Sequence, residues 1–206
     1  MRLNLERAIQ ITGGLSHTKK MPCPSWGISA KLCRSGQALR AVPNTTCSRC
    51  YGMKGHYPCP AVRTAHDNRL KGLEHPQWVD AMIYLIHMEC DRHFRWFDCG
   101  DIQSDKHMSQ IVAVCKNTPT IIHWLPTQER KMVRRWKDAI PINLTIRVSS
   151  IFIDVPSRSK DFPISFTAST LKHFPKEYHC RVTDGKCGQC RKCWDRNERI
   201  VGYNIK

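Results

Sequence analysis

The chain has 206 residues and a formal net charge of +16, from 33 Lys and Arg against 17 Asp and Glu. This basic excess favours an anionic partner, nucleic acid first, although basic residues also offset the charge of thiolate-bound clusters. The length predicts a single domain over residues 1–206, and no apolar run reaches the roughly 20 residues that a membrane-spanning helix needs.

The cysteine content indicates the compartment and the kind of site. No secretory leader is expected, because the N-terminal stretch MRLNLERAIQ carries charges where a leader is apolar. Twelve cysteines in a reducing cytoplasm favour metal ligands and core thiols over a disulfide framework. Geometry alone does not exclude a disulfide, since C-x2-C spacing can close one.

Residues 1–62 form a cysteine-rich N-terminal segment. Its first twenty residues predict a strand or short helix followed by a loop. Four cysteines follow, and because loop closure costs little more for long loops, they are consistent with a second metal centre. Alternatively, some of them are core thiols or complete another site, and Cys59 could replace one. The four are Cys23, Cys33, Cys47 and Cys50.

Residues 63–179 predict a core of alternating strands and helices. Helices are expected at 76–90, 105–115 and 128–136, and strands at 94–97, 120–124 and 142–148, with one or two short strands after residue 150. Repeated βα units indicate parallel strands with helices packed outside.

Polar residues at the ends of these strands are the candidates for chemistry, because α/β folds place their sites there. Asp98 and Asp101 suit a general acid–base pair or ligand carboxylates, but equally a turn and a helix cap. Gly100 would let a ligand approach the backbone. His123 either lines the same opening or packs in the core. Arg147 suits a phosphate or carboxylate of a cofactor.

Residues 180–206 contain the densest group of thiols. Three thiols at C-x2-C-x2-C with a fourth nearby are typical of the run that wraps a 4Fe–4S cluster, and zinc is the alternative. Lys and Arg surround the group and either contact nucleic acid or balance the thiolates. The predicted ligands are Cys180, Cys187, Cys190 and Cys193.

Several motifs in fixed order carry a family resemblance from about Gly13 to Trp194: GGLSHTKKMPC, CSRCYGMKGHY, HPQWVDAM, FRWFDCGDIQS, HWLPTQE and GKCGQCRKCW. Together they resemble the phage "gene product 88" domain family. The resemblance implies a viral protein in the cytoplasm of an infected bacterium. It also implies an α/β fold that is a partial or distorted βα barrel, resembling radical S-adenosylmethionine folds, with cysteine-rich metal-binding terminal segments.

The family motifs fall on the N-terminal cysteines, on the carboxylates and glycine of the DCGD stretch, and on the C-terminal cysteines. Cys99 stands where a small residue such as serine is expected. The chain lacks the C-x3-C-x2-C motif that leaves one iron open for S-adenosylmethionine, so only fold analogy points to radical chemistry.

Three functions follow as hypotheses. The first is an iron–sulfur protein that binds nucleic acid or another anionic partner. The second is an iron–sulfur enzyme that acts on a nucleotide or nucleic acid at the strand ends. The third is a zinc-stapled structural protein or a protein that interacts with a host protein.

Overall fold

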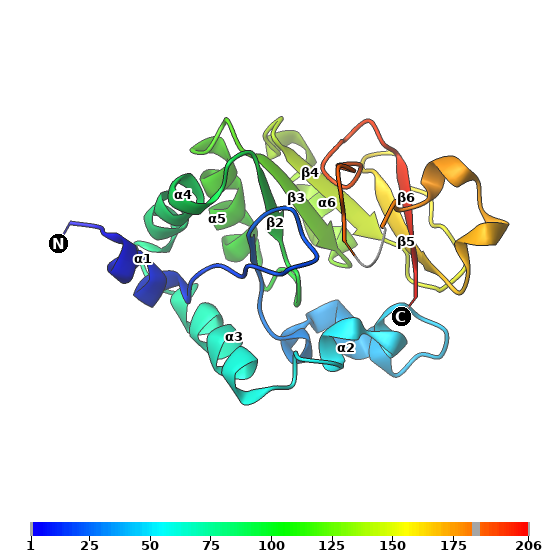
Figure 1. The fold of residues 1–206 in the computed structure, drawn as a ribbon, viewed down its shortest axis with the longest axis horizontal. Coiled ribbons are helices and arrows are strands. Elements are labelled where there is room, and N and C mark those ends of the chain that lie inside the picture. Colours follow the sequence, from blue (N-terminus) through cyan, green and yellow to red (C-terminus); the bar gives the residue numbers. More distant parts are fainter. Residues whose placement is uncertain (1, 183–185, 206) are drawn as a thin grey trace.

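One sheet of six strands organises the molecule (Figure 1). The computed structural model describes residues 2–182 and 186–205. The strands are β1 (Ser25–Trp26), β2 (His93–Trp96), β3 (Ile122–Thr127), β4 (Leu144–Ser149), β5 (Ile164–Ala168) and β6 (Ile200–Asn204). They lie in chain order, and each pairs in parallel with the next. Their carboxyl ends therefore meet along one side of the sheet, here called the carboxyl edge.

α-Helices connect the strands from β1 to β4, a loop connects β4 to β5, and two 3-10 turns lie between β5 and β6. The α-helices of the described residues are α1 (Leu5–Thr12), α2 (Arg34–Arg40), α3 (Pro60–Gly72), α4 (Trp78–Glu89), α5 (Asp105–Lys116) and α6 (Arg130–Arg135). The 3-10 turns are η1 (Ala30–Leu32), η2 (Cys47–Arg49), η3 (Tyr51–Met53), η4 (Lys137–Ala139), η5 (Leu171–His173) and η6 (Lys176–Tyr178). Local chemistry fixes the start of α5, where the Ser104 side chain accepts the His107 N–H at 3.1 Å and caps the helix.

Alternation along the strands gives the sheet two different faces. On β4, Leu144, Ile146 and Val148 join the main core, while Thr145 and Arg147 point the other way. Helices α1, α4, α5 and α6 pack on the first face and supply most of that core. Burying this apolar surface is the main stabilising term of the fold.

The other face is covered by residues 180–182 and 186–199, here called the C-terminal segment. The ring of Trp194 lies 5.1 Å from that of Trp124 on β3, and its Nε1 donates to the Phe94 carbonyl at 2.9 Å. Thr145 donates to the Trp194 carbonyl at 2.7 Å. These contacts hold the segment against β2, β3 and β4.

Residues 29–59, here called the cap, lie across the carboxyl edge, below the sheet in Figure 1. The Thr46 N–H donates to the Ile151 carbonyl at 2.8 Å, and the Thr46 hydroxyl lies 2.8 Å from that of Thr167 at the end of β5. Next to β2, the Ile28 N–H donates to the Cys99 carbonyl at 3.0 Å. The cap therefore closes the edge where the strand-end residues lie.

The structure confirms the mixed α/β class and the parallel strands with helices outside. The expected helices at 76–90 and 105–115 are α4 and α5, each within two residues of the prediction. Strand β6 was not expected, because it lies in the stretch assigned to the C-terminal metal segment. Across residues 2–182 and 186–205, none of the helices is long and apolar enough to span a membrane.

Candidate metal centre

Four cysteines gather where the cap meets the carboxyl edge. Two sulfurs, of Cys33 and Cys47, lie 3.6 and 3.9 Å from the point that a Cβ at residue 36 would occupy. The sulfurs of Cys99 and Cys50 lie 2.7 and 3.6 Å from the equivalent point at Gly52. Glycines thus leave the space into which these thiols point. The four are called the edge thiols: Cys33, Cys47, Cys50 and Cys99.

Burial keeps three of the edge thiols, those of Cys33, Cys47 and Cys99, protonated at neutral pH when no cation is bound. Burial first, and then the neighbouring Cys50, raise the pKa of Cys47 to about 11. Burial likewise raises the pKa of Cys99 to about 12. It also raises the pKa of Cys33, and the charges of Asp101 and the other edge thiols add to that. A soft metal cation would replace these protons and relieve the repulsion between thiolates.

The donor set fits a thiolate-bound metal by its chemistry, because four soft sulfur ligands are what zinc and iron–sulfur centres use. All twelve cysteines are free of disulfides. In the part of the chain that the structure describes, however, no three His, Cys, Asp or Glu side chains are arranged so that they could hold a metal ion. Binding therefore requires the edge thiols to turn inward.

A second group of thiols lies where the C-terminal segment meets the chain just before β1. The Cys187 N–H donates to the Lys20 carbonyl at 3.2 Å, and the Cys180 N–H donates to Gly202 on β6 at 2.9 Å. The Cys193 sulfur lies 3.1 Å from the Tyr203 hydroxyl. We call the group the C-terminal thiols: Cys23, Cys180, Cys187, Cys190 and Cys193.

Cys23 belongs to this second group and not to the edge thiols. It packs in one apolar cluster with Cys180 and Cys193. Burial raises its pKa to about 12. The charges of Arg95 and Arg191 oppose this rise, and the Cys187 thiol adds to it, so Cys23 lies near these residues. The structure therefore divides the predicted N-terminal set: Cys33, Cys47 and Cys50 stay together, while Cys23 joins the C-terminal ligands.

The two carboxylates of the DCGD loop after β2, those of Asp98 and Asp101, differ in their hydrogen bonding. Asp101 is 5 % exposed and accepts from the Ile102 N–H at 2.8 Å, the Thr127 hydroxyl at 2.6 Å and the Gln128 N–H at 2.8 Å. These bonds tie the end of β2 to that of β3, which is a structural role. Asp98 is as buried, yet among the described residues its Oδ1 has no hydrogen-bond partner.

A comparison with protein families gives the relationship of the chain. The family model described as Gene product 88 matches residues 3–196. The chain belongs to the gene product 88 family. Membership confirms the resemblance carried by the motifs and supports a bacteriophage origin. No curated protein and no solved structure matches the chain significantly, so the roles of residues in this family member come from its own geometry.

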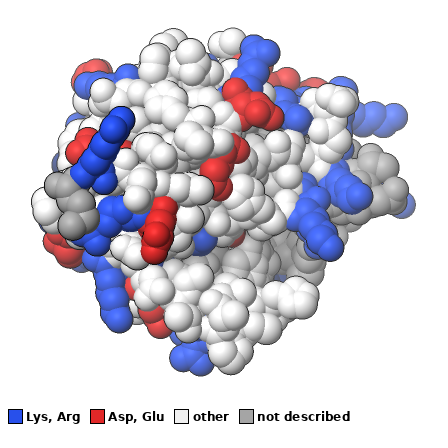
Figure 2. Space-filling view, turned by 60° about the vertical axis from the view of Figure 1, so that its left-hand side comes forward, with Lys and Arg blue, Asp and Glu red and all other residues white. Residues whose placement is uncertain are grey.

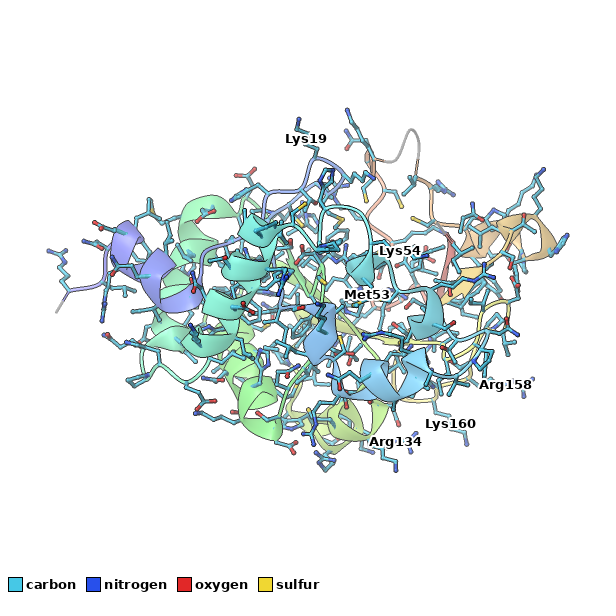
Figure 3. The ribbon with its side chains drawn as sticks, turned by 90° about the horizontal axis from the view of Figure 1, so that it is seen from below. Lys19, Met53, Lys54, Arg134, Arg158 and Lys160 are labelled. Atoms are coloured by element: carbon cyan, nitrogen blue, oxygen red, sulfur yellow. The ribbon has the colours of Figure 1, made fainter. Side chains whose placement is uncertain are left out.

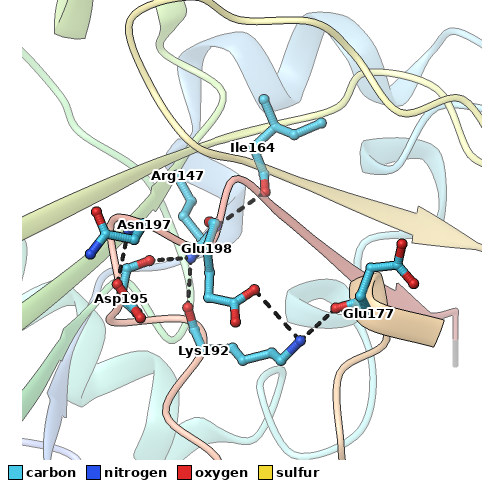
Figure 4. Close-up of polar contacts among 7 residues, drawn as sticks. All are labelled: Arg147, Ile164, Glu177, Lys192, Asp195, Asn197 and Glu198. Carbon is cyan, nitrogen blue, oxygen red and sulfur yellow. Dashed lines mark hydrogen bonds and ion pairs between the residues drawn. The ribbon is translucent and has the colours of Figure 1, made fainter. Parts of the chain in front are cut away.

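Arg147, predicted to bind a phosphate or carboxylate, has no free donor in this family member (Figure 4). It is fully buried, and its five N–H groups donate to five backbone carbonyls at 2.6 to 3.4 Å. Four of these carbonyls belong to the C-terminal segment. Arg147 therefore organises the backbone that carries the C-terminal thiols. The acceptors are Ile164, Lys192, Cys193, Asp195 and Glu198.

His123 and Gly100 also take structural places. His123 lies near the start of β3 on the helix-covered face, fully buried, with its Nε2 2.9 Å from the Thr118 hydroxyl and its ring stacked on Trp96. It does not meet Asp98 or Asp101 at the carboxyl edge. Gly100 has φ +86°, and a Cβ there would lie 2.5 Å from the Ile28 carbonyl oxygen. The backbone that approaches Gly100 closely is therefore that of Ile28, not a ligand.

Cys99 is the residue that sequence reasoning missed. It is 4 % exposed and its sulfur points at the Gly52 carbonyl, 3.9 Å away. It lies far along the sequence from the cap cysteines, so ligand spacing gives no signal for it. The one available signal was its position directly after a strand in a loop that parallel folds direct toward their sites.

Proposed function

We propose that this member of the gene product 88 family is a thiolate-ligated metal protein, an iron–sulfur protein in the first instance, that binds nucleic acid through its basic surface. The edge thiols carry the proposal, since four sulfurs from separate chain segments gather at the side of a parallel sheet where α/β proteins carry out chemistry. The C-x2-C-x2-C run of the C-terminal thiols favours iron over zinc.

Each thiol group has its own supporting residues. The cap positions Cys33, Cys47 and Cys50, and the loop after β2 brings Cys99 to them. Arg147 and Tyr203 hold the C-terminal segment on the sheet, with Tyr203 beside the Cys193 sulfur. A bound cluster would supply electron transfer or a covalent brace between these segments.

The finer proposal for the fold is a partial βα barrel resembling radical S-adenosylmethionine folds. Six parallel strands in chain order support it, because that order is what an open sector of a βα barrel has. The absence of C-x3-C-x2-C weighs against the cofactor itself.

An iron–sulfur enzyme is the second candidate, and one observation favours it. The Oδ1 of Asp98 is buried without a partner among the described residues, next to Cys99, so it is free to accept a hydrogen bond from a ligand. Asp101, His123 and Arg147 have structural partners. Of the side chains predicted to be catalytic or to bind a cofactor, Asp98 therefore remains the candidate for contact with a substrate.

Metal analysis tests the proposal. We expect the protein purified without oxygen to be brown, with iron and acid-labile sulfide in matching amounts at about four irons per cluster. Cys47→Ser should remove the share bound by the edge thiols, and Cys190→Ser the share bound by the C-terminal thiols. Iron, zinc and sulfide contents and the visible spectrum measure this.

The exposed Cys59 provides the matched control, because it lies outside both thiol groups. Cys59→Ser should keep the full metal content. Colourless protein with bound zinc would contradict the iron–sulfur assignment and support the hypothesis of a zinc-stapled structural protein. Wild-type protein without metal, or full metal content in both Cys47→Ser and Cys190→Ser, would rule out thiolate centres.

Gly52→Ala tests the edge site without removing any thiol. The new Cβ would lie 2.7 Å from the Cys99 sulfur and 3.0 Å from the Ala30 Cβ, so the sulfur must move out of the site. We expect a several-fold loss of metal at the edge thiols in chelator competition, with the C-terminal share unchanged. In the control Gly55→Asn, the Cβ meets nothing within 4 Å and asparagine tolerates the φ of +62°. Equal metal retention in both variants would contradict the geometry.

A further inference from the structure

Acidic residues are absent from a long stretch in the N-terminal third of the chain. From Arg7 to His66 there are nine Lys and Arg residues and no Asp or Glu. Elsewhere the charges are mixed: the face turned forward in Figure 2 carries acidic and basic side chains interspersed. The net charge of +16 is therefore unevenly distributed. The stretch without acidic residues includes the whole cap.

The cap cations have no carboxylate partners among the described residues, although Arg34 and Arg40 donate to backbone carbonyls. Within residues 2–182 and 186–205, none of the cap cations forms an ion pair. The loop after β4 adds exposed Arg158 and Lys160 beside it, joined to the cap by the bridge between Thr45 and Phe152. The two carboxylates of this loop are engaged elsewhere, Asp154 by Ser169 and Asp161 by Arg134. Figure 3 views the molecule from this side and labels Lys54, Arg158 and Lys160. The cap cations are Lys31, Arg34, Arg40, Arg49 and Lys54.

Two exposed aromatic rings accompany these cations. Tyr51 lies in the chain between Arg49 and Lys54 and is 50 % exposed. Its hydroxyl is held inward, since it donates to the Asp98 carbonyl at 2.6 Å and accepts from Arg95 at 3.0 Å. Phe152 is 45 % exposed on the adjoining loop. The Tyr51 ring is thus fixed before any ligand arrives, so little conformational entropy is lost on stacking.

We infer that the cap and the adjoining loop form a binding surface for single-stranded nucleic acid. Unpaired bases have exposed faces that stack on aromatic rings, whereas a duplex hides them, so the rings favour single strands. The cations neutralise backbone phosphates. The inference rests on the proposed nucleic acid partner and specifies its form and its site on the molecule.

Fluorescence anisotropy with the full chain tests this, using a labelled mixed-sequence DNA strand of about 20 nucleotides and the corresponding duplex over a range of salt concentrations. We expect the single strand to bind at least roughly tenfold more tightly than the duplex. Tyr51→Leu and Phe152→Leu should each weaken single-strand binding at least about fivefold, because base stacking on an aromatic ring contributes about 1–3 kcal/mol. Both should leave duplex binding nearly unchanged.

Charge variants separate the cap from the net charge. Replacing Lys31, Arg49 and Lys54 by Gln should reduce the slope of log affinity against log salt by about 0.7 for each phosphate that is no longer neutralised. The matched control replaces Arg92, Lys116 and Lys137, which are exposed before β2, on α5 and on η4, and should leave the slope unchanged. Equal effects of the two triple variants, or duplex bound as tightly as single strand, would overturn the inference.

Metal content measured on the same samples separates this inference from the metal proposal. Single-strand binding through the cap by protein without metal would leave the inference standing while the metal centre fails. Metal-loaded protein that binds neither strand form would sink the inference and the proposed nucleic acid partner, and leave the metal centre intact. Tyr51→Leu also removes the hydrogen bonds of the Tyr51 hydroxyl. If this variant lowers the thermal midpoint of unfolding, Phe152→Leu and the charge variants test the binding surface in its place.

Discussion

Arg147→Met should destabilise the protein by on the order of 4 kcal/mol, the range found when one side of a buried charged network is removed. The variant keeps most of the side-chain volume but leaves five buried or partly buried carbonyl groups without their donor. An unsatisfied buried acceptor is more costly than the net gain of one hydrogen bond, so the effect exceeds that of a normal core truncation. Urea unfolding followed by circular dichroism measures the loss.

The same variant should free the C-terminal segment before the whole protein unfolds. Trypsin should cut it faster after Lys186 and Arg191 than in the wild type. Arg147→Lys keeps the charge but lacks the planar fork that reaches five carbonyls, so it should recover only part of the stability. The matched control is Arg199→Met, since Arg199 is exposed although it also donates to carbonyls. A variant at 147 as stable and as protease-resistant as the wild type would contradict the role assigned to Arg147.

Periodic features of the chain could be predicted from the sequence. The helical spacing of Trp78, Met82, Leu85 and Ile86 predicted α4, because it places all four on the buried face. The C-terminal cysteines lie near one another because they are close in the sequence, and their role as metal ligands stays a prediction. In both cases the signal and the structure that it specifies are local.

Long-range partners could not be predicted in the same way. Cys99 and the cap cysteines come together because parallel strands bring all their carboxyl ends to one edge, and no spacing in the chain records this. Arg147 looks like an anion-binding residue at a strand end. Its carbonyl partners come into place only once the C-terminal segment folds over that face. The sequence therefore predicts that Arg147 binds acceptors at a strand end, but not that these acceptors are carbonyls of its own chain.

Two buried histidines should make the protein acid-labile. His107 is 2 % exposed, with an Nε2 that has no partner among the described residues, and His123 is fully buried with its Nδ1 in the same state. Burial lowers the pKa of each to about 3, against about 6.5 for an exposed imidazole. The folded protein therefore excludes protons that the unfolded chain binds.

The sign follows from the protons bound in each state. Between about pH 6.5 and 3 the unfolded chain holds up to one more proton per histidine, so stability falls as the pH falls, by about 1.4 kcal/mol per pH unit for each. Together the two histidines lower the free energy of unfolding by about 3 kcal/mol between about pH 7.5 and 5.5. Burial raises the pKa of Asp101 to about 7, so this carboxyl takes up a proton in the folded state first and offsets part of that loss. Urea titrations at the two pH values measure this difference.

Variants isolate the histidine contribution, because acid also competes with metal for the thiols. His107→Leu should change the difference in unfolding free energy between about pH 7.5 and 5.5 by about 1.4 kcal/mol in the stabilising direction at the lower pH, whatever it does to stability at neutral pH, since it removes one excluded proton. His56→Gln replaces an exposed histidine and should leave the loss unchanged. If His107→Leu retains the whole pH dependence, the acid lability comes from the thiol centres, and the neutral histidines of the core contribute only packing.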